Sequence, residues 1–448
     1  MDQRHVHEPF VYAALAIALT AGFGYATIDV AALAFGLPLG ARWIALVQAH
    51  GHAQLFGWAG LFVIGVGLFF LPRLRGTTLA RIELAPWTLA CLVVGIVLRA
   101  ISQPIMPLSS LYAALGRFGT MLSGATELVG VALFITMIVS SFRRARPLSP
   151  DAPIKPVRPF LALAMVSLFI STILNAILSS YSALSDLSVF PSSFDDVLTH
   201  LMIYGFIIPM AMALSVRNLP LFMRLASPPK RGLVPLFILY VIGLACRLIG
   251  QLEHGFWLPL GEIIENATLL VFIWQLDVIF RRKTPWTASR TQPPANYIET
   301  RPPTRKHYPD HEEFGRFELL VISAYSWLAF ACIIAIVDGA FSILGNLTLF
   351  NPDIERHAVT VGFITLLIFG MAVRMLPGFS GKSRVASTRL VMATFWLGNL
   401  TALLRVVPLF APDVDGMNIA LGLSGAIGWL AVACLAINLH RTFKSKPS

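Results

Sequence analysis

Runs of apolar residues long enough to cross a bilayer occupy most of this chain. Only 13% of its 448 residues are charged and 56% are hydrophobic, whereas a soluble protein carries about 25% charged residues. A helix of roughly 20 apolar residues spans a membrane. Such runs lie at about 11–36, 49–71, 85–101, 118–142, 159–181, 197–219, 233–250, 259–280, 317–345, 356–377, 388–408 and 417–440. We therefore predict an all-α, polytopic membrane protein with about twelve transmembrane helices.

Basic residues fall on alternate loops between these runs. Arginine and lysine gather in the two tails and in the even-numbered loops, while the odd-numbered loops hold only Arg42, Arg117 and Arg356. Because basic residues gather on the cytoplasmic side of membrane proteins, we predict that both termini are cytoplasmic and that the first helix is retained. His5 and His7, in the polar N-terminal tail, are expected at the surface. The net charge of +11 then requires no nucleic-acid partner.

One apolar pattern occurs three times along the chain. Aligned on His52, His200 and His357, a glycine follows five residues later, a second small residue thirteen later, and Leu-Pro closes each stretch. The glycines are Gly57, Gly205 and Gly362; the second small residues are Gly65, Ala213 and Gly370; the closing pairs are Leu71–Pro72, Leu219–Pro220 and Leu376–Pro377. Ungapped copies roughly 150 residues apart indicate an internal repeat.

The repeat divides the twelve runs into three units of four helices. We place these units at residues 1–150, 151–282 and 317–448, with a Pro-rich, basic, cytoplasmic linker at 283–316. The histidine-bearing helix is the second of each unit, and all three run from the outer face inward. The units are therefore predicted to be parallel copies with pseudo-threefold symmetry about the membrane normal. This arrangement places the three histidines at one depth, in the outer third of the bilayer.

The repeated histidines are the strongest candidates for chemistry. An ionisable side chain inside a membrane costs about 2.5 kcal/mol or more at mid-depth, so such residues are candidate functional groups by default. Imidazole is a standard ligand of haem iron and of copper. We predict that His52, His200 and His357 bind a metal or haem, with His50 as a further ligand. The alternative is a structural histidine that was inherited by triplication.

Helical geometry places these groups around each helix. At 100° per residue, the glycine and the second small residue lie about 140° and 220° from the histidine, where they let another helix approach closely. His50 lies about 160° from His52, on the small-residue side. His50 is then either buried at a helix contact or part of a second centre on the opposite face.

A second repeated layer contains arginines. Arg99, Arg247 and Arg405 follow the three aligned histidines by 47, 47 and 48 residues, on helices that run outward, so they reach the same depth. A guanidinium group there could hold a haem carboxylate through two hydrogen bonds. The alternative is an ion pair with a glutamate near the start of the following helix: Glu127, Glu262 or Glu265.

Two further features bear on the cofactor. His254, in an outer loop, is a candidate additional ligand. The cysteines form no CxxC or CxxCH motif, so disulfides and covalently attached c-type haem are not expected. All of them lie inside apolar runs: Cys91, Cys246, Cys332 and Cys434.

These features resemble known membrane proteins. Twelve runs, three parallel units and histidines on the second, sixth and tenth helices resemble the catalytic subunit of haem-copper oxidases. The stretches HGHAQLFGWAGLF and RHAVTVGFITLLIFGMAVRMLPGFSG resemble the NnrS family. That resemblance implies a bacterial inner-membrane protein that contains haem and copper and serves nitric oxide metabolism or resistance to nitrosative stress. The chain departs from the oxidases because its His-x-His, at His50 and His52, stands on the second helix rather than the tenth.

The first hypothesis is therefore an NnrS-like metalloprotein whose haem, with copper as a second candidate, binds nitric oxide or another small diatomic near the periplasmic face. Such gases cross lipid, so no polar channel is required, and a redox partner is a further candidate. A second hypothesis is a transporter or channel that uses the buried His, Arg and Glu layer as a substrate or proton path. A third is a scaffold or sensor whose 283–316 linker contacts a cytoplasmic partner. The sequence leaves open whether the chain catalyses a reaction.

Overall fold

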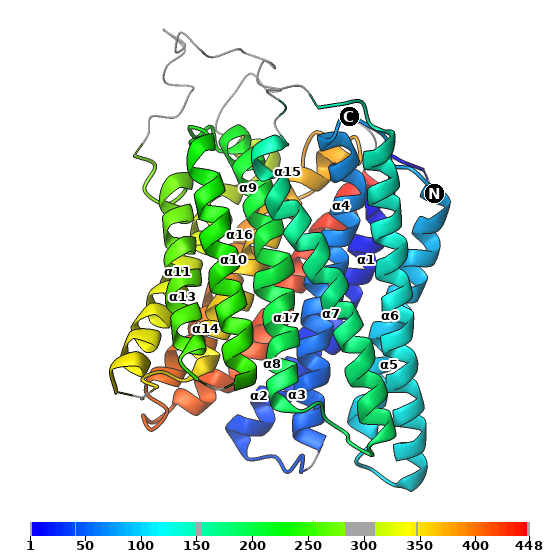
Figure 1. Cartoon of the computed structure of the whole chain (residues 1–448), viewed down its shortest axis with the longest axis vertical. Helices are drawn as coiled ribbons and strands as arrows, with labels where there is room; N and C mark the ends of the chain where they lie inside the picture. Colours follow the sequence, from blue (N-terminus) through cyan, green and yellow to red (C-terminus); the bar gives the residue numbers. More distant parts are fainter. Residues whose placement is uncertain are drawn as a thin grey trace.

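The protein is all-helical in its computed structural model. The structure describes residues 2–40, 42–148, 152, 154–253, 255–282, 310–345 and 348–445, and no β-strand occurs among them. These residues form twelve helices that are long and apolar enough to cross a membrane, arranged in one bundle (Figure 1). The predicted all-α, twelve-span architecture is confirmed.

Most of the spans are built from more than one helical element. The first four contain α1 (His7–Ile17), η1 (Ala18–Gly22), α2 (Phe23–Phe35), α3 (Arg42–His52), η2 (Ala53–Gly60), α4 (Leu61–Leu74), η3 (Ile82–Leu84), α5 (Ala85–Ile105) and α6 (Ser110–Arg144). The next four contain η4 (Lys155–Val157), α7 (Arg158–Leu184), α8 (Ser192–His200), η5 (Leu201–Ile207), α9 (Ile208–Phe222), α10 (Lys230–Glu253) and α11 (Trp257–Leu276). The last four follow the short α12 (His311–Phe314) and contain α13 (Phe317–Gly345), α14 (Pro352–His357), η6 (Ala358–Thr365), α15 (Leu366–Phe379), α16 (Thr388–Val406), η7 (Val407–Phe410) and α17 (Met417–Lys444).

The three histidine-bearing spans form the centre of the bundle. They are Arg42–Leu74, Ser192–Phe222 and Pro352–Phe379, and their most apolar windows are 89%, 83% and 78% buried, whereas no other span exceeds 44%. The remaining spans surround them. The candidate ligands are therefore shielded from lipid by a layer of other helices.

The repeated glycines mark where each central helix meets the first helix of its own predicted unit. A Cβ added to Gly57 would lie 2.5 Å from Ile17 Cγ2, a separation that real side chains do not adopt. Equivalent close neighbours are Ser167 for Gly205 and Trp327 for Gly362. In lipid, small residues of this kind let helix backbones pack closely. The predicted close helix contact at this position is confirmed, while the symmetry operation that would relate the units stays a prediction.

Each central helix changes to a π-helix directly after its histidine. The three π segments are η2, η5 and η6, and each follows its histidine without a break. Such wide turns are rare and often occur at functional sites. Because their geometry differs from 100° per residue, angles calculated for an ideal α-helix do not hold beyond the histidine.

The Leu-Pro pairs do not end the central helices, contrary to the sequence expectation. Each helix continues for two residues past its proline, to Leu74, Phe222 and Phe379. A proline removes only its own N–H, and membrane helices tolerate that loss where neighbouring groups satisfy the freed carbonyl.

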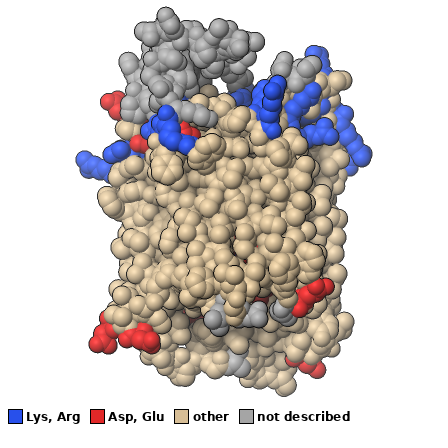
Figure 2. Space-filling view, turned by 60° about the vertical axis from the view of Figure 1, so that its left-hand side comes forward, with Lys and Arg blue, Asp and Glu red and all other residues tan. Residues whose placement is uncertain are grey.

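Charge is segregated between the two ends of the bundle. Both termini lie at the same end (Figure 1). On the face shown in Figure 2, arginine and lysine gather at that end with some acidic residues, while the charged side chains at the other end are acidic. Uncharged side chains cover the region between. This distribution agrees with the topology predicted from the loops, in which the basic end is cytoplasmic; the side of the membrane itself stays a prediction.

Candidate functional site

His50 and His357 are oriented by backbone carbonyl groups. The Nδ1–H of His50 donates to the carbonyl of Gly22 at 2.9 Å, and that of His357 donates to the carbonyl of Asp353 at 2.8 Å. Gly22 ends the π-helix η1 with a ψ of −103°, outside the helical range, which frees its carbonyl. Because a carbonyl can only accept, each ring carries its proton on Nδ1 and keeps a lone pair on Nε2. Metal-binding histidines are commonly oriented in this way.

His52 is oriented instead by a buried glutamate, and His200 lies beside another without a hydrogen bond to it. Nε2 of His52 lies 2.9 Å from Glu127 Oε1, Nε2 of His200 lies 3.1 Å from Glu265 Oε2, and both glutamates are wholly buried. Each imidazole also stacks on the aromatic ring four residues later, with ring centroids 4.4 Å apart in both pairs. Nδ1 of His52 is buried and has no hydrogen-bond partner in the described part of the chain. A carboxylate that fixes the proton on Nε2 leaves the lone pair of Nδ1 available to a metal.

A cavity of about 350 Å³ lies beside these histidines. Its lining includes His50, His52 and His357 together with Arg99 and Arg405, and side chains of the first, second, sixth, tenth, eleventh and twelfth spans complete its walls. The volume falls in the range of roughly 300–1,000 Å³ that is usual for cofactor and small-molecule sites. The structure therefore brings three of the four predicted ligands and two of the three predicted arginines to one cavity.

Both basic and acidic side chains line this cavity: Arg99 and Arg405 lie with Asp29, Asp195, Asp196 and Asp353. Arg99 is buried, with Nε donating to Gln103 Oε1 at 3.0 Å and Nη1 donating to Asn175 Oδ1 at 2.6 Å. Arg405 lines the same cavity, as does Asp29, whose two carboxylate oxygens are buried without a hydrogen-bond partner among the described residues. Arg99, whose hydrogen bonds go to amides, is therefore placed to bind an anionic group in the cavity.

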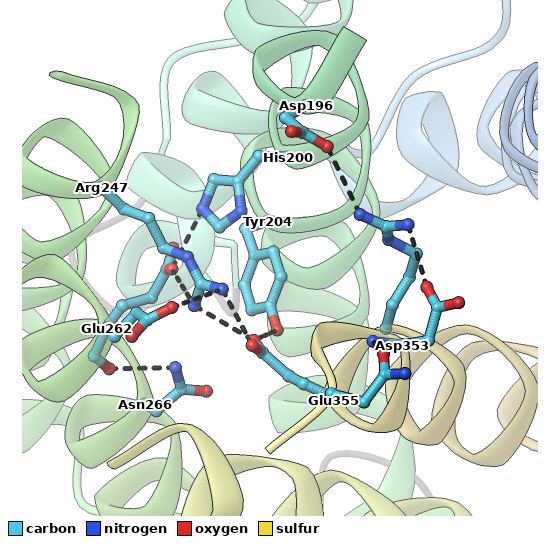
Figure 3. Close-up of polar contacts among 11 residues, drawn as sticks. Asp196, His200, Tyr204, Arg247, Glu262, Asn266, Asp353 and Glu355 are labelled. Atoms are coloured by element: carbon cyan, nitrogen blue, oxygen red, sulfur yellow. Dashed lines mark hydrogen bonds and ion pairs between the residues drawn. The ribbon is translucent and has the colours of Figure 1, made fainter. Parts of the chain in front are cut away.

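Arg247, in contrast, is held by protein carboxylates. Its Nη1 and Nη2 donate to the two oxygens of Glu355 at 3.0 and 2.8 Å, and Glu262 lies 3.3 Å from Nη2 (Figure 3). Glu355 also accepts from the Tyr204 hydroxyl at 2.6 Å. Together with His200, these residues line a separate cavity of about 110 Å³. This geometry favours the ion-pair alternative for Arg247 over the role of a cofactor ligand.

Sequence reasoning missed two residues of these networks. Glu355 stands two residues before His357, the register position that His50 holds before His52, yet it contacts Arg247 of the second unit. Asn175 lies inside an apolar run and bridges Arg99 to Glu127, to which it donates at 3.1 Å. A charged residue at the start of a repeated helix was the available signal for Glu355. A single amide in an apolar run gives no comparable signal.

The donor set suits haem better than a metal ion held by several protein ligands. Within the residues that the structure describes, no group of three or more His, Cys, Asp or Glu side chains converges as a metal site. Haem needs only one or two axial ligands from the protein, and imidazole supplies them. His254, the predicted additional ligand, and residues 283–309 of the predicted linker lie outside the described residues.

Comparison with known proteins supports part of this interpretation. Residues 313–443 match the family described as NnrS protein. The resemblance to the NnrS family is confirmed. A search of curated proteins finds no match. Among solved structures, the chain is similar to a haem-copper terminal oxidase dimer, with 13% sequence identity over 99% of this chain and 85% of that chain and a TM-score of 0.67. At this identity the similarity shows a shared fold.

Proposed function

We propose that the protein binds haem in the 350 Å³ cavity, with His50 and His357 as the ligands of its iron. The observation that carries the proposal is the pair of imidazoles, from two different spans, whose Nδ1 protons are fixed by backbone carbonyls and whose Nε2 atoms remain without a protein partner among the described residues. Haem supplies an iron that binds small diatomic molecules and exchanges electrons. The similarity to a haem-copper oxidase fold and to the NnrS family supports the same choice.

The other polar groups would hold the periphery of the haem. Arg99 and Arg405 are the residues of this cavity that would bind its carboxylates, and the aromatic side chains of Phe56 and Trp58 contribute apolar wall. Arg99 is hydrogen-bonded to neutral amides, and a guanidinium group stays charged in a protein interior. Arg247 would stabilise the junction of the second and third units instead.

Copper is proposed as a second metal, at His52 or His200. The buried glutamate beside each ring would act as the carboxylate that orients a metal-bound imidazole. Imidazole nitrogen suits copper as well as iron. Since the described residues hold no preassembled group of three ionisable donors, a copper ion there would take its remaining ligands from water or a bound molecule.

The molecule bound at the iron is proposed to be nitric oxide, which would exchange with one of the two histidines, at the periplasmic end of a bacterial inner-membrane protein with both termini in the cytoplasm. Nitric oxide is uncharged and crosses lipid, so it can reach a cavity between membrane-spanning helices without a polar channel. The resemblance to the NnrS family supports this ligand, and the basic end of the bundle supports the orientation (Figure 2).

Optical and metal analysis of the purified protein tests the proposal. Wild-type protein should show a Soret band, a shift of that band on addition of nitric oxide, and copper by elemental analysis. Colourless protein without iron would overturn the haem proposal and would favour the transporter hypothesis. Iron without copper would overturn the copper proposal alone.

A further inference from the structure

A second cavity, of about 80 Å³, lies among the halves of the central helices nearest the two termini. Its walls come from α4, α9 and α15 and from the ends of η5 and η6. Figure 1 shows α4, α9 and α15 at the end of the bundle that holds both termini. Aliphatic and aromatic side chains form nearly all of the lining, joined by three methionines: Met210, Met371 and Met375. Methionine thioethers are polarisable and flexible, so they can adapt to a small apolar guest.

The lining of this apolar cavity gives a water molecule too few hydrogen-bond partners. Ser215 is the one polar residue among the described residues of its lining, and its hydroxyl oxygen already accepts from the Tyr325 hydroxyl at 2.6 Å. A buried water needs about two to four polar partners, whereas cavities lined by apolar side chains stay dry and take up xenon or benzene. The volume is well above the roughly 10–15 Å³ that one water-sized molecule requires. A small uncharged molecule is therefore the guest that fits.

One side chain lies between the apolar cavity and the histidine-lined cavity. Ile364, in the π-helix η6, contributes to the walls of both. It is buried, and it belongs to one of the three wide turns that follow the histidines. Buried side chains change rotamer even in well-packed interiors. A rotation of this isoleucine is thus the smallest movement that would join the two spaces.

We propose that the apolar cavity is a binding site for small uncharged gas molecules and that it feeds the histidine-lined cavity past Ile364. The first part stands on the chemistry of the lining alone. The second part, a reservoir for the ligand of the iron, rests on the haem proposed above.

Xenon binding tests the first part without any need for haem. Crystals of the full-length protein under xenon pressure should show xenon between α4, α9 and α15. Ala211 lines the cavity, and Ala211→Leu should fill it and abolish that site, whereas Ala90→Leu, on the outward side of α5, should not. Because overpacking can prevent folding, Gly67→Ala provides a milder second variant. A Cβ there makes only ordinary contacts, at 3.6 Å, and should reduce xenon occupancy.

Absence of xenon from the wild-type cavity, or full occupancy in both filled variants, would overturn the binding site. The reservoir is tested by flash photolysis of nitric oxide from the haem. A slow recombination phase should be present in wild type and lost in Ala211→Leu, while Ile364→Ala should speed exchange. Identical traces in wild type and Ala211→Leu would overturn the reservoir even if xenon binds. Lack of haem would overturn the proposed function and leave the xenon result standing.

Discussion

Replacement of Arg247 tests whether a buried ion pair joins the second and third units of the bundle. Arg247, on α10, binds both carboxylate oxygens of Glu355, on α14, and the two side chains are only 10% and 13% exposed. In Arg247→Met, the carboxylates of Glu355 and Glu262 would remain in the interior without their cation. Because an uncompensated buried charge is costly, we expect the free energy of unfolding to fall by about 3–5 kcal/mol. Haem content per folded molecule should not change.

Arg356 provides a matched control one residue after Glu355. It pairs with Asp353 at 3.0 Å and with Asp196 at 3.3 Å, but the side chains of these pairs are 36% to 50% exposed. Exposed ion pairs contribute roughly 0–1 kcal/mol. Arg356→Met should therefore lower the thermal stability much less than Arg247→Met, although both substitutions remove one guanidinium group.

Thiol labelling during thermal unfolding in detergent measures both variants, since Cys246 and Cys332 are buried and react when the helices separate. A double-mutant cycle with Glu355→Gln isolates the pair. The double variant should be less destabilised than the two single variants together, with a coupling energy of about 0.5–3 kcal/mol. Equal unfolding temperatures for the two arginine variants, or a coupling energy of zero, would refute the reasoning.

Three other parts of the molecule give further predictions. Burial lowers the pKa of His7 to about 4 from its ordinary 6.5. His7 therefore binds a proton in the unfolded state at pH values where the folded state keeps it neutral. The free energy of unfolding should fall by up to about 3 kcal/mol as the pH drops from 6.5 to 4. His7→Leu should lose this pH dependence when unfolding is measured across that range. A Cβ on Gly362 would lie 2.6 Å from Trp327, so Gly362→Ala should lower the unfolding temperature while Gly378→Ala, which has open space, should not. Reporter fusions at either terminus should indicate the cytoplasm, and a periplasmic signal from either would contradict the topology.

The sequence was sufficient for the architecture because the membrane restricts the choices so strongly. Apolar runs of span length could only become helices, and all twelve did. The glycines after the aligned histidines also predicted real helix contacts, as Gly57 against Ile17 illustrates. Backbone rules of this kind depend on the local sequence and can be recognised without knowing which helices become neighbours.

The candidate site was less accessible, because its polar contacts join residues far apart in the chain. Nothing near His52 in the sequence indicates that Glu127 would meet its ring, and nothing near His50 indicates the carbonyl of Gly22. The π-helices also change the angles at which the glycine and the second small residue were placed relative to each histidine. His7 shows the same limit, since its polar neighbours suggested the surface but the ring is wholly buried and lies 3.2 Å from Ser380 Oγ.

The haem content of single histidine variants tests the central claim most directly. His50→Ala and His357→Ala should each lose the haem absorption of the wild type, because each removes a proposed ligand of the iron. His52→Ala should keep the band, since Glu127 engages Nε2 of that ring and the proposed ligands of the iron are His50 and His357. Full haem content in both His50→Ala and His357→Ala, measured per folded molecule, would contradict the proposed site.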